Sequence, residues 1–237
     1  MSQMTELDVL AVGAHPDDVE VGIGGIVAKL AKQGHRVAIL DLTEGELATR
    51  GSVEERRAEA QFAARILGIA QRANAKLPDG AIANDGPMRQ TLIGILRSLR
   101  PRVLLCPMHT DRHPDHDAAH YLVRDANYLA GLARIDTGHA PHRAAHVCYY
   151  RVYGETTPPN AVIDVSETFE TKLAALRAYK SQLFNPQYEG AETFVSSETF
   201  WNSIATRASY WGARIGVAYG EPLYSETPIA LSTLPGL

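Results

Sequence analysis

The stretch Ala14-His15-Pro16-Asp17-Asp18 decides how the chain is interpreted, because it places an imidazole and two carboxylates at the end of an apolar run. Residues 7–14 have the continuous apolar pattern of a buried strand, and the glycine-rich residues 22–34 have a helical pattern. In an α/β protein, such a junction between a strand and a helix commonly carries the glycine-rich turn of a dinucleotide site.

The spacing of polar residues at this junction argues against a dinucleotide. Gly13 is in register with the first glycine of such a turn, but His15 and Asp18 occupy the positions of the second and third. These side chains would block the close approach of a pyrophosphate, and the carboxylates of Asp17 and Asp18 would repel it. Imidazoles and carboxylates are instead ligands that suit a divalent cation.

Length and composition favour one globular domain spanning residues 1–237. The chain is 45% hydrophobic, which is enough to bury a full core. Its net charge of -4 and the absence of a Lys/Arg cluster argue against a nucleic-acid partner and favour a small molecule. The sequence contains no apolar window of the roughly 20 residues that a membrane span needs. We therefore expect a cytoplasmic protein without a membrane partner.

Strand and helix patterns alternate through the first two thirds of the chain. This alternation predicts a single α/β domain with a Rossmann-like, mainly parallel sheet and helices on both faces. Later strands are predicted over residues 36–41, 72–77, 103–107, 146–153 and 161–165. Later helices are predicted over residues 88–99, from about 117, over 168–180 and over 197–214.

The sequence also predicts one helix between Ser52 and Gly68 and an irregular C-terminal segment. A helix is expected to begin after Ser52 and end at Gly68, with an apolar stripe that includes Phe62, Ile66 and Leu67. Residues 220–237 are rich in proline and are expected to be irregular. This segment and the preceding apolar helix favour a homo-oligomer.

A second polar cluster follows the predicted strand at residues 103–107. It consists of His109, Asp111, His113, Asp115 and His116. In the doubly wound strand order 3-2-1-4-5, the first and fourth strands are neighbours, and ligands bind in the crevice at their carboxyl ends. We therefore expect the two clusters to meet.

Three residues of the combined clusters form the ligand set of a hydrolytic zinc site. His15, Asp18 and His116 would supply two imidazoles and one carboxylate and leave one position for water. Zinc lowers the pKa of bound water to about 7 and polarises a carbonyl group. We expect one Zn²⁺ per subunit, and Fe²⁺ or Co²⁺ accepts the same donors.

Three neighbouring residues have predicted catalytic roles. Asp17 stays off the metal and is the candidate general base. His113 is expected to donate a proton or a hydrogen bond to the oxyanion that forms at the attacked carbonyl. Asp115 is expected to orient His113 and to keep it protonated through its negative charge.

With both motifs in place, the chain resembles the LmbE-like (PIG-L) zinc de-N-acetylases, which remove acetyl groups from N-acetylglucosaminyl conjugates. The resemblance rests on the first motif and on His113-Pro114-Asp115-His116, and extends through Thr43-Glu44-Gly45, Arg56 with Glu59, Pro78-Asp79 and Ser181-Gln182. It implies the LmbE-like fold and a zinc-dependent N-deacetylase. It also implies zinc ligation by His15, Asp18 and His116, with Asp17 as the base and His113 as the electrostatic catalyst.

Within this family, the chain most resembles the deacetylases of bacillithiol biosynthesis, which act on N-acetylglucosaminyl malate. Thr49-Arg50-Gly51-Ser52 and Phe184-Asn185-Pro186 carry this similarity. Because malate has two carboxylates, a cationic contact is expected. The candidate substrate-binding residues are Arg50, Arg56 and Arg151 for the carboxylates, and Asp79 for the sugar hydroxyls.

Several alternatives stay open from the sequence. The enzyme could be a thiol S-conjugate amidase or act on another N-acetylated amino sugar, and a nucleotide-binding module without a catalytic metal is a third interpretation. Arg50 and Arg151 could be plain surface charges, and Arg56 with Glu59 an exposed ion pair. His120 lacks the neighbouring Glu of a His-Glu-x-x-His motif and is expected to be an ordinary residue on a helix face.

Overall fold

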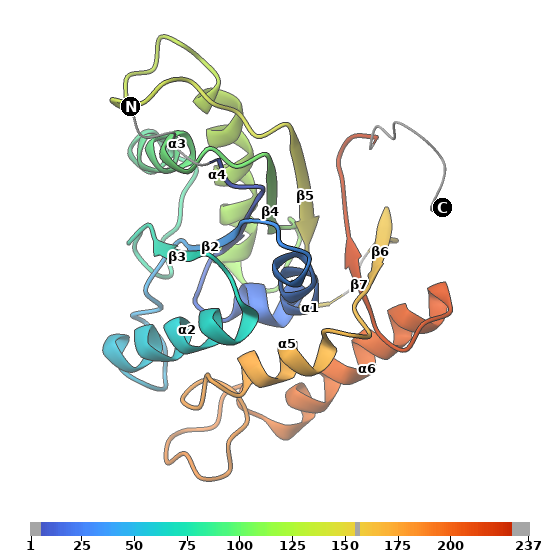
Figure 1. The fold of residues 1–237 in the computed structure, drawn as a ribbon. Coiled ribbons are helices and arrows are strands. Elements are labelled where there is room, and N and C mark those ends of the chain that lie inside the picture. The colour runs from blue at the N-terminus through green and yellow to red at the C-terminus, as the bar shows by residue number, and fades with distance from the viewer. Residues whose placement is uncertain (1–5, 155–156, 229–237) are drawn as a thin grey trace.

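The computed structural model describes residues 6–154 and 157–228, and Figure 1 shows the fold. Within these ranges a parallel sheet has the strand order β3-β2-β1-β4-β5. Its strands are β1 (Val9–Gly13), β2 (Val37–Asp41), β3 (Gln71–Asn74), β4 (Val103–Pro107) and β5 (His146–Tyr150). Strands β6 (Ala161–Asp164) and β7 (Gly220–Leu223) form a separate antiparallel pair. The predicted strand order is confirmed.

Helices cover both faces of the parallel sheet, as Figure 1 shows. They are α1 (Asp18–Lys32), α2 (Val53–Leu67), α3 (Gly86–Leu99), α4 (Pro114–Ala130), α5 (Phe169–Leu176) and α6 (Glu198–Ile215). Alternating side chains of each strand point to opposite faces. Val9 and Ala11 of β1 therefore pack in one core with α1, α2 and α5, whereas Leu10 and Val12 pack in a second core with α3 and α4. The predicted α/β domain with two covered faces is confirmed.

The glycine-rich sequence of α1 is explained by close packing. A Cβ atom on Gly22 would lie 2.3 Å from Cδ2 of Tyr150, and one on Gly25 would lie 2.8 Å from Cβ of Val165. These distances are too short for any side chain. The glycines of α1 therefore let the helix approach its neighbours.

Helix α2 has the predicted ends but a different buried face. Ser52 Oγ accepts a hydrogen bond from the backbone N–H of Glu55 at 3.1 Å, and Gly68 ends the helix with φ 72°. Phe62 is 48% exposed, so its assignment to the apolar stripe is wrong. The helix buries small residues instead, namely Ala60, Ala63 and Ala64, together with Leu67.

Helices α1 and α4 begin several residues earlier than predicted, inside the two polar motifs. Helix α1 starts at Asp18, and α4 starts at Pro114 with His113 as its N-cap. Proline is favoured in the first turn because its missing N–H would have no partner there. The early starts place Asp18 and Asp115 in first turns, where the helix dipole favours negative charge.

The C-terminal segment is more regular than expected. Residues 220–223 form β7 rather than an irregular segment, because they pair with β6. Tyr224 then forms backbone hydrogen bonds in both directions with Tyr149 of β5. Residues 229–237 of the segment lie outside the described part of the chain. No described helix combines the length and apolar character needed to cross a bilayer.

A buried ion pair fastens β7 to α1 where that helix is interrupted. Ile23 has non-helical angles of φ -139° and ψ 25°. The carboxylate of Glu221 accepts hydrogen bonds from the backbone N–H groups of Gly25 (3.0 Å) and Ile26 (2.7 Å). It also accepts one from Lys172 Nζ of α5 at 2.5 Å, and both charged side chains are buried. The contact therefore joins three elements.

We expect Glu221→Ala to lower the free energy of unfolding by about 3–5 kcal/mol, because it leaves the Lys172 charge buried without its partner. Urea denaturation measures this change. Glu167→Ala is the matched control, since Glu167 pairs with Lys32 on the exposed surface and should contribute little. An equal decrease in the free energy of unfolding in the two variants would contradict a stabilising role for the Glu221–Lys172 pair.

Candidate functional site

The two polar clusters meet at the carboxyl ends of β1 and β4, as their adjacency in the sheet predicts. The ring centroids of His15 and His113 lie 4.7 Å apart, and those of His113 and His116 lie 5.0 Å apart. The expectation that these segments converge is confirmed.

The carboxylate of Asp18 lies between two imidazoles. Its Oδ2 is 3.4 Å from Nδ1 of His15, and its Oδ1 is 3.2 Å from Nε2 of His116. Oδ2 also accepts a hydrogen bond from the backbone N–H of His15 at 2.8 Å. All three residues are buried. The structure therefore brings together the three predicted metal ligands.

The orientation of His116 fits a bound cation. Its Nδ1 lies 3.1 Å from Oδ1 of Asp111, and the negative charge of this carboxylate favours a proton on Nδ1, although the two groups are not aligned for a hydrogen bond. In the neutral ring, Nε2 then presents a lone pair toward Asp18, which also has only lone pairs to offer. Two acceptors that face each other need a proton or a cation between them.

Electrostatics at these imidazoles also favours positive charge. Burial alone would lower the pKa of His116, but Asp18 and Asp111 outweigh it and raise the pKa to about 9. Burial would also lower the pKa of His15. The carboxylates of Asp115, Asp18 and Asp79 outweigh this effect and raise the pKa well above its usual value. The site is thus strongly negative unless it holds protons or a metal ion.

Other donors surround the same position. The ligand atoms of His15, His113 and His116 lie within 4.8 Å of one another, and so do those of His15, Asp79 and Asp115. Nε2 of His15 lies 3.0 Å from Asp79 and 3.2 Å from Asp115. His15 could therefore belong to more than one set of three metal ligands.

Asp17 is held in a strained backbone conformation at the edge of the site. It has φ 110°, which costs a non-glycine residue of the order of 1–3 kcal/mol. Its Oδ2 lies 3.7 Å from a guanidinium nitrogen of Arg56. Arg56 is itself fixed by the carbonyl groups of Gly45 (2.9 Å) and Pro16 (3.0 Å).

Burial raises the pKa of Asp17 to about 7, although the charge of Arg56 opposes this shift. Asp18 adds to the rise through its negative charge. A carboxyl group with a pKa near neutrality can both accept and release a proton at physiological pH.

The structure places Asp115 differently from the expected orienting role. Among the described residues, its carboxylate contacts His15 and the backbone N–H of Gly80, the latter at 2.8 Å. It is the backbone N–H of Asp115 that donates to Nδ1 of His113, at 3.2 Å. Helix capping therefore orients His113, because the early start of α4 makes this histidine the N-cap.

The expectation that Asp115 keeps His113 protonated finds no support in the electrostatics of the site. Burial lowers the pKa of His113, and the charges of His15 and His116 lower it further. The opposite effects of Asp18 and Asp115 are smaller. Since Nδ1 accepts a hydrogen bond, the neutral ring carries its hydrogen on Nε2 and can donate it.

These residues lie in an open cleft of about 460 Å³, which is large enough for a small organic ligand. Asp17, Asp18, His15 and His113 contribute to its lining. Of the predicted substrate-binding residues, Arg56 and Asp79 also line it. One oxygen of Asp79 contacts His15, and the other accepts from the backbone N–H of Leu47.

Arg50 and Arg151 do not line this cleft, so their predicted contact with substrate is not supported. Nε of Arg50 donates to the carbonyl of Ser181 at 2.7 Å. Arg151 donates to the carbonyls of His109 (3.2 Å) and Thr110 (3.0 Å). The alternative that they are surface charges is also wrong, since both are buried and fasten loops.

The alternative of an exposed Arg56–Glu59 ion pair is wrong as well. Both residues are buried. Glu59 accepts hydrogen bonds from the backbone N–H and the hydroxyl of Ser181, at 2.8 and 2.7 Å. It therefore joins α2 to the loop after α5.

Arg112 and Phe194 line the cleft but were not predicted from the sequence, and Tyr153 lines it beside them. The exposed guanidinium of Arg112 lies 3.9 Å from the ring centroid of Phe194 and 5.5 Å from that of Tyr153. The position of Arg112 directly before His113 is a signal that could have identified it. The contribution of Phe194 depends on a distant loop and has no such local signal.

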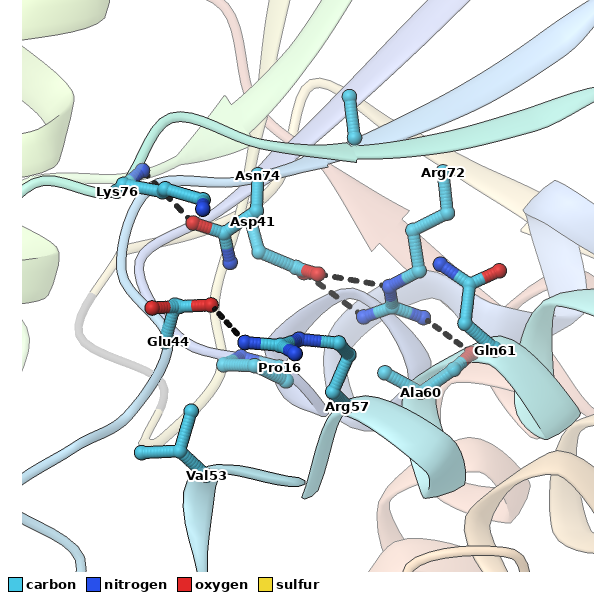
Figure 2. Close-up of a pocket in the computed structure, with 11 residues that line it drawn as sticks. Pro16, Asp41, Glu44, Val53, Arg57, Ala60, Gln61, Arg72, Asn74 and Lys76 are labelled. Carbon is cyan, nitrogen blue, oxygen red and sulfur yellow. Dashed lines mark hydrogen bonds and ion pairs between the residues drawn. The ribbon is translucent and has the colours of Figure 1, made fainter. Parts of the chain in front are cut away.

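A separate pocket of about 120 Å³ lies behind the first motif, and Figure 2 shows its paired charges. Arg72 binds Asp41 through two nitrogens, at 2.7 and 2.8 Å, and Glu20 of α1 at 2.5 Å. Glu20 also accepts a hydrogen bond from Tyr179 at 2.9 Å. Since the partners of Arg72 are already in place, this network braces the start of α1 rather than offering free ligands.

Comparison with known proteins gives a consistent result. The family model "PIG-L: GlcNAc-PI de-N-acetylase" matches residues 10–127, which include both polar motifs. The diacetylchitobiose deacetylase of Thermococcus kodakarensis is 30% identical, and the match covers 96% of this chain and 86% of that protein. The probable N-acetyl-α-D-glucosaminyl L-malate deacetylase 2 of Bacillus anthracis is 28% identical, with coverage of 83% and 95%.

A solved structure is similar over almost the whole chain. The conserved protein TT1542 from Thermus thermophilus superposes with a TM-score of 0.88 and is 36% identical. The match covers 98% of this chain and 99% of that one. The arrangement of strands and helices described above is therefore shared with a known fold.

Proposed function

The chain belongs to the PIG-L family of de-N-acetylases, and on that premise we propose that it is a zinc-dependent hydrolase acting on an N-acetylglucosamine conjugate. The observation that carries this proposal is the convergence of His15, Asp18 and His116, with Asp17 beside them, in an open cleft. A nucleotide-binding module without a metal has no comparable support, because these polar groups occupy the position of the phosphate-binding turn.

We assign the metal to His15, Asp18 and His116. This donor set suits Zn²⁺, and Fe²⁺ or Co²⁺ accepts the same ligands. When bound, such an ion supplies Lewis acidity, which favours ionisation of water at neutral pH and polarises a carbonyl group. Asp111 supports the site from outside by holding His116 in the required orientation.

The remaining chemistry belongs to Asp17 and His113. Asp17 accepts a proton from the attacking water, as its pKa of about 7 allows. Nε2 of His113 donates a hydrogen bond to the oxyanion that develops on the acetyl group. The water oxygen forms a bond to the acetyl carbon, and the amide C–N bond then breaks as Asp17 returns the proton to the departing amine, which leaves acetate and a free amino sugar.

For the conjugate, we propose N-acetylglucosaminyl malate as the substrate. Arg112 is exposed in the cleft and available to a carboxylate of the malate group, and Arg56 adds positive charge nearby. The similarity to the Bacillus anthracis protein supports this choice. Diacetylchitobiose is the second candidate, supported by the Thermococcus kodakarensis relative and by the aromatic side chains of Tyr153 and Phe194 in the cleft.

A pair of variants separates metal binding from proton transfer. We expect His15→Ala to lose metal from this site and to lose activity. Asp17→Asn should keep the metal but lower kcat by roughly 10²- to 10⁴-fold, because only the base is removed. Metal analysis and assays of acetate release measure both properties. Equal metal loss in the two variants would remove Asp17 from the role of base.

The pH profile tests the link between Arg56 and Asp17. Asp17 must be deprotonated to act as a base, so kcat/KM should fall as the pH drops through its pKa. Arg56→Gln removes a charge that lowers this pKa and should move the acidic limb to higher pH. Arg56→Lys keeps the charge and should leave the limb closer to that of wild type. A limb that does not move in Arg56→Gln would argue against this link.

Steady-state kinetics with two substrates test the role of Arg112. We expect Arg112→Ala to raise KM for N-acetylglucosaminyl malate by roughly 10- to 100-fold, as a lost charge-assisted hydrogen bond predicts. KM for the uncharged diacetylchitobiose should change much less. The same increase for both substrates would contradict recognition of a carboxylate by Arg112.

A further inference from the structure

A second cluster of potential metal ligands includes a residue of the loop that follows β4. It consists of His109 in that loop, His120 on α4 and Glu226 after β7. The ligand atoms of these three residues lie within 4.8 Å of one another. The cluster shares no residue with His15, Asp18 and His116, and the proposed reaction does not use it.

The side chain of His120 is completely buried. Its Nδ1 lies 3.2 Å from the carbonyl oxygen of Pro107. Because a carbonyl oxygen only accepts hydrogen bonds, Nδ1 carries the hydrogen, and Nε2 of the neutral ring has a bare lone pair. Nε2 has no hydrogen-bond partner and lies 3.3 Å from Oε1 of Glu226.

The buried Nε2 lone pair of His120 faces the solvent-exposed carboxylate of Glu226, and a positive charge between them would satisfy both groups. The hydrogen bond from Nδ1 to the Pro107 carbonyl leaves no hydrogen for Nε2 in the neutral ring. A metal cation satisfies both groups and can also bind the His109 ring, whose centroid lies 4.9 Å from that of His120.

Neighbouring groups form hydrogen bonds with all three donor side chains of the cluster. The Pro107 carbonyl fixes the tautomer of His120, and the hydroxyl of Tyr149 donates to Oε2 of Glu226 at 3.0 Å. Nδ1 of His109 lies 2.7 Å from Oγ1 of Thr110, which leaves its Nε2 for another partner. Outer partners of this kind are characteristic of histidine and carboxylate ligands in metal sites.

We propose that His109, His120 and Glu226 bind a second divalent cation of the Zn²⁺ class. Two imidazoles and one carboxylate match the preferences of zinc. The cation would tie the segment after β7, which already pairs with β5 through Tyr224, to the loop that leads into the catalytic cluster (Figure 1). Arg151 holds the backbone of this loop at the His109 carbonyl, and the cation would hold the His109 side chain.

Metal analysis of the full chain tests this site independently of activity. After equilibration with Zn²⁺ and dialysis, wild type should retain about two zinc ions per chain and Glu226→Gln about one. His109→Gln should lose the same ion as Glu226→Gln. Glu167→Gln, which alters another exposed carboxylate, is the matched control and should retain both ions.

Two further variants make the assignment specific. His15→Ala should keep the ion that depends on Glu226, so the double variant His15→Ala/Glu226→Gln should retain none. Tyr149→Phe should weaken zinc binding at the second site by roughly 10- to 100-fold in a titration against a chromophoric chelator.

The inference is overturned if Glu226→Gln and wild type retain the same amount of zinc, or if wild type retains a single ion that His15→Ala removes. Both results leave the proposed deacetylase intact. Failure of the chain to release acetate from any N-acetylated sugar would contradict the proposed function without changing the zinc count.

Discussion

The site depends on the carboxylate of Asp18, which is buried between the imidazoles of His15 and His116. Such a group is costly to bury unless a proton or a cation compensates its charge. The fold makes the arrangement possible because β1 and β4 are adjacent and parallel, so that the segments after them emerge side by side. The network of Glu20, Arg72 and Asp41 then holds the start of α1, which carries Asp18.

Much of this arrangement follows from the sequence through local rules. The alternation of strands and helices predicts the sheet order, and that order predicts which two polar segments meet. Helix starts were less predictable, since Pro114 and the capping of His113 move the beginning of α4 into the motif. This shift changes how His113 is held: a backbone N–H orients it instead of the carboxylate of Asp115.

Features that depend on distant parts of the chain could not be derived from spacing. Arg50 and Arg151 have the residue type expected for binding an anion, yet both are buried against carbonyl groups of loops remote in sequence. The protonation of His113 likewise depends on burial and on two other imidazoles. His120, an ordinary helix residue by its pattern, lies opposite Glu226 only because β7 brings the C-terminal segment to β5.

The most direct test is a crystal structure of the zinc-equilibrated protein with anomalous data collected at the zinc absorption edge. The account predicts a peak about 2.0–2.2 Å from ligand atoms of His15, Asp18 and His116, with Asp17 outside bonding distance. Absence of a peak among these three residues, or direct ligation by Asp17, would contradict it.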